Sequence, residues 1–284
     1  MSVEWSDDPA IEGELRIDER WTCRLLEDFI RIEVERTGKL EVVVGLSGGI
    51  DSAVSAFLAA RALGGKHVLG LSLPYRTSDP DSLEHARLVA RQCGIRHEVV
   101  DITPLVDAFV EGAVGLDPVR AGNVMARQRM IVLFDRSAAH DALVLGSTNK
   151  TELLLGYGTL HGDMASAINP IGDLYKTQVR ALAAHMEVPA EVIAKPPSAD
   201  LWPGQKDEDE LGASYDLLDR VLALLVDARV SDDRAAASGI DLGLVRDVRR
   251  RIVRSQFKRK LPVIAKVSTR SVGWDFRYPR DWMS

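Results

Sequence analysis

The chain has 284 residues, of which 46% are hydrophobic and 27% charged, and its formal net charge is −6. This composition is that of an ordinary folded protein with a core of its own, and the acid excess argues against a protein whose whole surface binds nucleic acid. No apolar run reaches the ~18–20 residues of a membrane-spanning helix. Residues Met1 to Ala10 lack the pattern of a secretory signal, and Cys23 and Cys93 are too few for a disulfide framework. We expect a cytoplasmic protein that has no membrane partner.

Helical and strand patterns alternate along the first half of the chain. Trp21, Leu25, Phe29 and Ile32 recur at helical spacing, and proline after Asp79 is typical of a helix start. The patterns predict, in chain order, a helix over Asp18–Arg36, a strand over Leu40–Leu46, a helix over Ser52–Leu63, a strand over His67–Leu73, a helix from Asp79 to Gly94, a strand over Glu98–Ile102, a helix from Thr103, a long helix over Gly122–His140 and a strand over Ala142–Leu145.

This alternation predicts an α/β fold: a doubly wound, mostly parallel sheet flanked by helices, with right-handed crossovers. The second half of the chain reads as a helical C-terminal elaboration, so we expect residues 1–284 to form a single domain. Ligands of such sheets bind beyond the carboxyl ends of the strands. Two segments meet at that edge, the turn after the first strand and Gly146–Asp163 after the fourth.

The first of these segments, Gly45 to Ser52, has the sequence of a phosphate-binding turn. Two glycines allow close backbone approach, successive N–H groups at a helix start bind anions, and the hydroxyls of Ser47 and Ser52 add donors. It is neither a Walker A loop nor a dinucleotide fingerprint, because no lysine follows and the glycine spacing differs. Ser-Gly-Gly-x-Asp-Ser arises by chance in fewer than about one such chain in a thousand. The alternative is a glycine-rich turn with Asp51 at a helix start.

A bound triphosphate needs a cation beside it. Magnesium takes one or two carboxylates and completes its shell with water and phosphate oxygens. Asp51 at the first edge segment and Glu152 at the second are the candidate ligands. Either acid could instead be a solvated surface carboxylate.

Several blocks, in order, resemble the ammonia-dependent NAD synthetases, a family of the PP-loop ATP pyrophosphatases with an adenine nucleotide alpha-hydrolase-like fold. The resemblance extends from about Arg20 to Trp282. Its blocks are Gly45–Ser52, Leu73–Arg76, Gly122-Asn123 with Ala126–Met130, Gly146–Glu152, Ile168–Lys176, Lys195–Leu201 and Asp207–Gly212.

The resemblance implies a ligase reaction. A substrate carboxylate, by default that of nicotinic acid adenine dinucleotide, attacks ATP to give an acyl-adenylate and pyrophosphate, and ammonia then displaces AMP. The implied ATP-binding residues are Gly45, Leu46, Ser47, Gly48, Gly49, Ile50, Asp51, Ser52, Ser147, Lys176 and Ser198, with Mg²⁺ on Asp51 and Glu152. Asp51, Lys176 and Asp163 are the implied catalytic residues, Asp163 through its association with ammonium.

The resemblance implies an acceptor site at Arg127, Leu160, Ala167, Phe257 and Lys258, and this is where the chain departs from the family. Leu160 stands in place of a lysine, Ala167 in place of an aspartate and Phe257 in place of a histidine. Loss of polar partners weakens selectivity for a polar ligand. One explanation is compensation by neighbours such as His161. The other is a paralogue that amidates a different carboxylic acid, smaller or less charged.

Other roles stay open for several of these side chains. Arg127 could be helix-surface charge, Lys176 a helix-start cation and Asp163 a turn residue. Residues Trp202–Glu210 are either a mobile lid or a solvated loop. The basic run Arg246–Lys260 is either a solvated helix face or, at Lys258, a substrate contact.

The family that the chain resembles is homodimeric. We expect no glutaminase domain, because the chain has no spare length for one, so nitrogen should come as free ammonia or from a separate partner. Support for a dimer comes from apolar side chains that could equally be core, namely Met130, Ile131, Leu133 and Phe134. Two other functions stay open. One is a non-catalytic nucleotide-binding module, which would not need the paired acids or Lys176. The other is tRNA modification, which the absence of Cys pairs disfavours.

Overall fold

A parallel sheet forms the centre of the computed structural model, which describes residues 15–202, 204–260, 262–273 and 275. Its strands are β1 (Glu41–Gly45), β2 (Val68–Ser72), β3 (Arg96–Val99) and β4 (Ala142–Leu145). All pair in parallel, in the order β3-β2-β1-β4. The order reverses direction next to β1, so the α/β prediction of a doubly wound sheet is confirmed.

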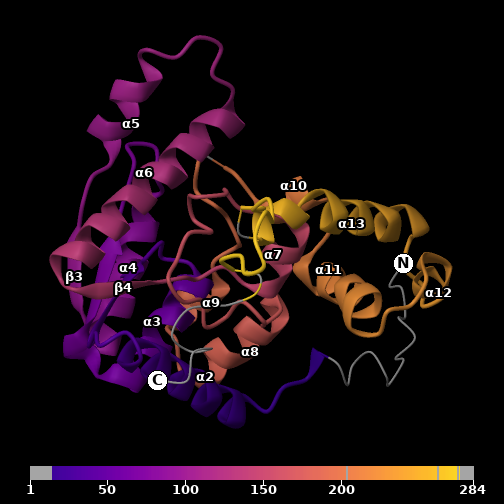
Figure 1. The fold of residues 1–284 in the computed structure, drawn as a ribbon, viewed down its shortest axis with the longest axis horizontal. Helices are drawn as coiled ribbons and strands as arrows, with labels where there is room; N and C mark the ends of the chain where they lie inside the picture. The colour runs from indigo at the N-terminus through magenta and orange to yellow at the C-terminus, as the bar shows by residue number, and fades with distance from the viewer. Residues whose placement is uncertain (1–14, 203, 261, 274, 276–284) are drawn as a thin grey trace.

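Alternate side chains of β1 pack into the hydrophobic clusters on the two faces of the sheet. Val42 and Val44 pack with α3 (Ile50–Leu63) and the neighbouring helices α2 (Glu19–Glu35), α4 (Pro80–Cys93) and α8 (Lys176–His185). Val43 points the other way, into a cluster with α5 (Thr103–Val110) and α6 (Pro118–Ala139). This alternation follows from the two-residue period of a strand. The helices therefore cover both faces, and the strand ends remain open on one edge (Figure 1).

The predicted bounds of the third strand and of the long helix are wrong by two to four residues. The third strand extends from Arg96 to Val99 rather than from Glu98 to Ile102, because it is an edge strand whose first residues are polar and reach the surface, so hydropathy does not mark its bounds. The long helix begins at Pro118 rather than Gly122. The side chain of Asp117 caps it by accepting from the Arg120 amide at 2.8 Å, and proline occupies its first turn.

The apolar stripe that predicts the first helix does not face the core. Helix α2 is present, but Trp21 is 69% exposed and Leu25 60%. The buried side is formed by Cys23, Ile30 and Val34. The prediction of a helix is therefore correct, although the apolar residues that indicate it lie on the exposed face of the helix.

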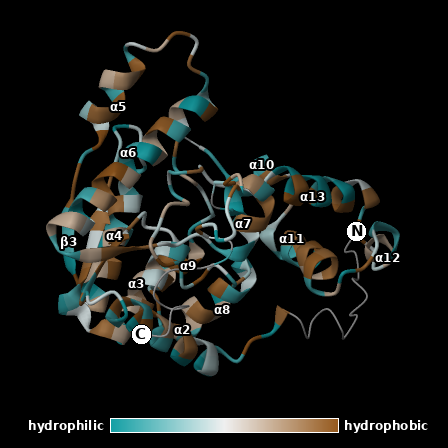
Figure 2. Ribbon diagram, in the orientation of Figure 1, coloured by the Kyte–Doolittle hydropathy of each residue, from teal (hydrophilic) through white to brown (hydrophobic). Residues whose placement is uncertain are grey.

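The C-terminal half is helical, as predicted, and has a core cluster of its own. After α7 (Lys150–Leu155) and α8 come α9 (Ala190–Ala194), α10 (Asp207–Leu211), α11 (Tyr215–Leu222), a π-helical turn (Ala223–Asp227), α12 (Asp232–Ala236) and α13 (Leu242–Arg254). Tyr215, Leu218 and Val245 are among the residues that pack together here. Helices α11 to α13 lie on the side of the molecule away from the sheet (Figure 1), and α13 is largely hydrophilic (Figure 2).

Within the described residues, no helix combines the length and the apolar character needed to cross a membrane. The segment Met1–Ala10, for which the sequence predicts no secretory signal, lies outside the described residues.

Ile30→Ala should lower the free energy of unfolding by about 2–5 kcal/mol, because it opens a cavity under a side chain with no exposed surface. Leu40→Ala is the control, since Leu40 is 67% exposed and should change stability by less than about 0.5 kcal/mol. Urea denaturation followed by circular dichroism measures both. Equal losses for the two variants would contradict the orientation of α2 described above.

Candidate functional site

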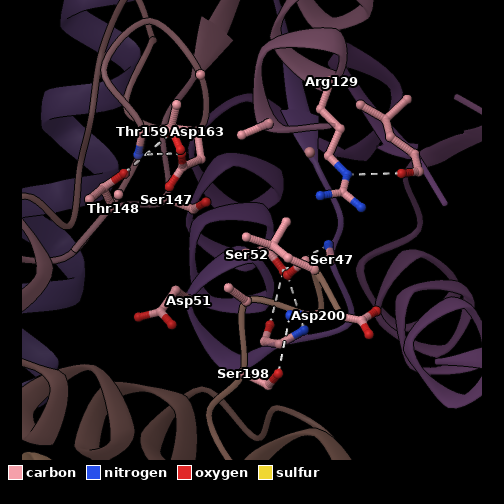
Figure 3. Close-up of a pocket in the computed structure, with 18 of the residues that line it drawn as sticks. Ser47, Asp51, Ser52, Arg129, Ser147, Thr148, Thr159, Asp163, Ser198 and Asp200 are labelled. Atoms are coloured by element: carbon pink, nitrogen blue, oxygen red, sulfur yellow. Dashed lines mark hydrogen bonds between the residues drawn. The ribbon is translucent and has the colours of Figure 1, made fainter. Parts of the chain in front are cut away.

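A cavity of about 580 Å³ opens at the carboxyl ends of β1, β2 and β4. Segments far apart in the sequence line it: the phosphate turn, residues 71–74, 78–80, 82–83, 144–148, 156–159, 162–163 and 195–202, and side chains from α6 and α10. Figure 3 shows side chains from these segments converging on one space. The two edge segments that the sequence singled out therefore meet as predicted.

The phosphate turn is held in one conformation by its own hydroxyls and by α4. The Ser52 hydroxyl donates to the Gly49 carbonyl at 2.9 Å and lies 3.1 Å from the Ser47 hydroxyl (Figure 3). Gly48 has φ +76°, and a Cβ there would lie 2.1 Å from the Ser82 carbonyl oxygen. Only glycine fits this position. The cavity is lined by the rest of the turn, namely Gly45, Leu46, Ser47, Gly49, Ile50, Asp51 and Ser52.

A buried lysine joins the two carboxylates that the sequence proposed as metal ligands. Lys176 is 3% exposed, and its Nζ contacts the Asp51 carboxylate and lies 3.5 Å from Glu152 Oε1. The Asn149 side-chain amide donates to Asp51 Oδ1 at 2.9 Å. The Tyr215 ring lies on another side of the ammonium group, with its centroid 5.0 Å from Nζ, a distance suited to a cation–π contact.

Three local features aim these groups at one point. Asp51 stands in the first turn of α3 and Lys176 is the first residue of α8. Glu152 is fixed by a capping box: the Asn149 side chain accepts from the Glu152 amide at 2.9 Å, and Glu152 Oε2 accepts from the Asn149 amide at 3.1 Å. The site is thus built from the starts of three helices.

Burial and neighbouring charges both shift the ionisation of this cluster. Burial and the neighbouring Asp51 raise the pKa of Glu152 to about 8, although Lys176 opposes the shift. Burial alone would lower the pKa of Lys176, but Asp51 and Glu152 outweigh it and raise that pKa above its usual range. Lys176 is therefore positively charged, and one cation does not compensate both acids.

This donor set fits magnesium. Carboxylate oxygens are its preferred protein ligands, and it needs only one or two of them when phosphate and water supply the rest. Asp51 and Glu152 stand beside the phosphate turn, and both carboxyl groups are directed at the ammonium group of Lys176. Among the described residues no group of three or more His, Cys, Asp or Glu side chains forms a fuller metal site.

Asp163 is another acid of the cavity wall, with Lys258 near enough to act on its charge. Its Oδ1 accepts from the Thr159 amide at 2.7 Å (Figure 3). Burial raises the pKa of Asp163, against the opposing effects of that hydrogen bond and of the Lys258 charge. Such a carboxyl group is a stronger base than one in water, which suits proton transfer.

The predicted ATP residues Ser147 and Ser198 line the cavity, and so does the segment proposed as a lid. Within that segment Asp207 is 4% exposed and accepts from the Tyr157 hydroxyl at 2.9 Å and the Tyr215 hydroxyl at 3.2 Å. The alternative of a solvated loop is therefore wrong for Asp207. The mobile lid stays a prediction. Pro203 lies outside the described residues.

The predicted acceptor residues divide into two groups. Lys258 lines the cavity and donates to the carbonyls of Gly156 and Gly158 at 2.8 and 2.7 Å. The other predicted acceptor residues do not line it; these are Arg127, Leu160, Ala167 and Phe257. Arg127 Nε donates to the Leu160 carbonyl at 3.3 Å, so these two are neighbours outside the cavity.

The basic run is only partly a solvated face. Arg259 donates to the carbonyls of Leu153, Leu154 and Ile252 at 2.7–3.0 Å, which satisfies the carboxyl ends of α7 and α13. On α13, Arg249 pairs with Asp232 and Arg251 with Asp247. Much of the positive charge is thus used within the fold.

Two cations in the cavity wall were missed. Arg129 Nε donates to the Leu73 carbonyl at 3.0 Å, and its remaining guanidinium nitrogens point into the cavity (Figure 3). Lys195 Nζ donates to the Ser82 hydroxyl at 2.7 Å. Arg129 and Lys195 both lie within the sequence blocks on which the family resemblance rests. Their place in those blocks is the feature of the sequence that could have identified them. Charge alone does not distinguish these two residues from the other 34 lysines and arginines of the chain.

Comparison with known proteins agrees with this geometry. The NAD synthase family model matches residues 22–262. The ammonia-dependent NAD synthetase of Chlorobaculum tepidum is 54% identical over 91% of this chain and 93% of its own length. Among solved structures, the NMN synthetase of Francisella tularensis (TM-score 0.78, 31% identity) covers 88% of this chain and 99% of its own. The ammonia-dependent NAD synthetase of Campylobacter jejuni (TM-score 0.75, 35% identity) covers 88% and 100%. The chain therefore belongs to the NAD synthase family.

Proposed function

We propose that this chain is an ammonia-dependent ligase that adenylates a nicotinate carboxylate with ATP and converts it to the amide, releasing AMP and pyrophosphate. The default acceptor is nicotinic acid adenine dinucleotide, which gives NAD. Support comes from relatives that are 52–54% identical and carry the name NH₃-dependent NAD⁺ synthetase. The observation that carries the proposal is the buried Lys176 between Asp51 and Glu152 beside a phosphate turn.

In the proposed reaction the turn backbone holds the phosphates of ATP at the start of α3. The acceptor carboxylate oxygen forms a bond to the α-phosphorus as the bond to the β-phosphate oxygen breaks. Lys176 faces the charge that grows on these oxygens, and its fixed position means that no reorganisation is needed. Asp51 and Glu152 would hold Mg²⁺, which when bound neutralises phosphate charge and orients the leaving pyrophosphate.

Amide formation needs a nucleophile with a free lone pair. We place ammonium beside Asp163, whose carboxylate takes one proton and so frees the lone pair of ammonia. The ammonia nitrogen then attacks the acyl carbon, AMP leaves, and the second proton released from the nitrogen passes to solvent. The raised pKa of Asp163 supports this role. Ser147 and Ser198, which line the cavity, are proposed hydrogen-bond partners of ATP.

The reaction is tested by incubating the chain with ATP, Mg²⁺, ammonium and the dinucleotide acid, and measuring pyrophosphate and amide. Wild type should form both in equal amounts, and Lys176→Gln should lower kcat by about 10²–10³. Lys39→Gln is the matched control, because Lys39 pairs with Asp141 on the surface. ATP turnover without amide, or an unchanged rate for a folded Lys176→Gln protein, would refute the assignment.

Gly48→Ala should abolish ATP binding or raise the KM for ATP at least ~10-fold, because the new Cβ would displace either the turn or Ser82. Gly38→Ala is a matched control: φ is +75°, and nothing lies within 4 Å of its Cβ. It should cost about 1 kcal/mol of backbone strain and leave the KM for ATP unchanged. Titration calorimetry with ATP checks both variants. Similar effects of the two substitutions would argue against a phosphate role for the turn.

A second candidate acceptor is the shorter mononucleotide acid, which gives NMN. Two observations favour it. Leu160, Ala167 and Phe257 replace polar residues of the family at the expected dinucleotide contacts, and a structural neighbour with a TM-score of 0.78 is named NMN synthetase. An acceptor without the adenylate half would not need those partners.

The two acceptors are distinguished by the ratio of their kcat/KM values, measured under the same conditions. A higher value for the dinucleotide supports NAD synthesis, and a higher value for the mononucleotide supports the second candidate. If the dinucleotide is the poorer substrate, Leu160→Lys with Ala167→Asp should improve it by about 10-fold or more, since each restored partner contributes about 1 kcal/mol.

We also propose a homodimer, supported by the exposed apolar side chains Ile131 (52%) and Phe134 (41%) on α6. Met130 and Leu133 do not contribute, because they line the cavity. Arg127 lies on the same helix, so a partner on this face would cover the predicted acceptor residues. Light scattering is expected to give twice the chain mass of 31.2 kDa, and a monomer at micromolar concentration would contradict the proposal. We further propose that residues 1–284 form a single domain and that the protein is cytoplasmic.

A further inference from the structure

Asp219 is a fully buried carboxylate outside the cavity. It lies on α11 with no exposed surface, and it is not among the residues that line the cavity. A buried acid is costly unless it is hydrogen-bonded, so its partners show what it does in the fold.

Those partners are the first turns of α7 and α8. Asp219 Oδ1 accepts from the Thr151 hydroxyl at 2.5 Å, and Oδ2 accepts from the Thr177 amide at 2.8 Å. The Thr151 oxygen in turn accepts from the Lys176 amide at 3.0 Å. One carboxylate thereby satisfies, directly or through a hydroxyl, the amides of the first two residues of α8, while the Gln178 side chain accepts from the preceding Tyr175 amide at 2.9 Å.

Thr151 and Thr177 each lie next in sequence to an ionisable residue of the candidate site. Thr151 precedes Glu152, and Thr177 follows Lys176. The hydrogen bonds of Asp219 therefore fix the backbone from which both side chains extend, without touching the side chains themselves.

The same helix also contacts the other end of the lysine. Tyr215, one turn before Asp219 on the same face of α11, places its ring 5.0 Å from Lys176 Nζ. One helix face thus supports Lys176 at its backbone and at its ammonium group. A helix needed only for packing would not require a buried charge at this position.

We infer that Asp219 is a positioning residue that sets the placement of Lys176 and Glu152 by bridging the starts of α7 and α8. The inference rests on the proposed function for its effect on rate. Because Lys176 acts on charge that develops during adenylation, a small displacement should reduce kcat more than it changes substrate binding.

The test compares kcat and the KM for ATP in four variants. Asp219→Asn replaces one acceptor by a donor, and Thr151→Val removes the hydroxyl while keeping the shape. Each should lower kcat at least ~10-fold with less than a ~3-fold change in the KM for ATP. Thr151→Ser retains the hydroxyl and should stay within about twofold of wild type. The double variant should be little worse than either single one, because both break the same bridge.

Val221→Ala controls for lost stability. Val221 is fully buried on the same helix, but it points roughly 200° away from Asp219. At a matched drop in melting temperature it should retain kcat. A normal kcat in Asp219→Asn, an equal loss in Val221→Ala, or no rescue by serine would each overturn the inference.

A crystal structure of Asp219→Asn gives a readout that does not depend on turnover. Displacement of Lys176 from Asp51 and Glu152 supports the inference, and unchanged contacts contradict it. Wild type is assayed in parallel, so an inactive wild type would count against the proposed function alone.

Discussion

The structure depends on one buried ammonium group that is held between two acidic side chains. Lys176 contacts Asp51 and lies 3.5 Å from Glu152, with almost no solvent to screen the charges. Charges in such surroundings interact far more strongly than on a surface, but each also loses its hydration. The arrangement is stable only if the three groups are held in register. The capping box at Asn149 and the bridge from Asp219 supply that register.

This constraint explains why the fold has a helical half beyond its sheet. A four-stranded parallel sheet provides the edge and the phosphate turn, but only Asp51 of the three charged residues belongs to that part. Glu152 and Lys176 stand at the starts of α7 and α8. Helix α8 also packs in the core cluster of β1, but α11 of the C-terminal half holds the first turns of both helices. The C-terminal cluster around Tyr215 anchors them, so the second core serves the site as much as the stability of the chain.

The fold class and the chemically distinctive part of the site were predictable from sequence for physical reasons. Strands such as Ala142–Leu145 are short and uniformly apolar, and Gly48 has a backbone conformation that selects glycine. The start of β3 was not predictable, because an edge strand tolerates exposed polar residues. Asp207, Asp219 and Arg129 were not identified as contributors, since their importance comes from burial and from partners dozens of residues away. A single sequence does not reveal which of 42 acids are buried.

The bridge through Asp219 also has a consequence for the order in which the protein matures. Asp51, Glu152 and Lys176 leave the ribosome before the residue that fixes the last two. A nascent chain ending near Leu145 has every strand of the sheet and the phosphate turn, yet it has no means of aligning the charged centre. Contacts between residues this far apart form late and slowly. Competence for catalysis therefore requires synthesis to continue through α11, well past the point at which the nucleotide-binding edge is complete.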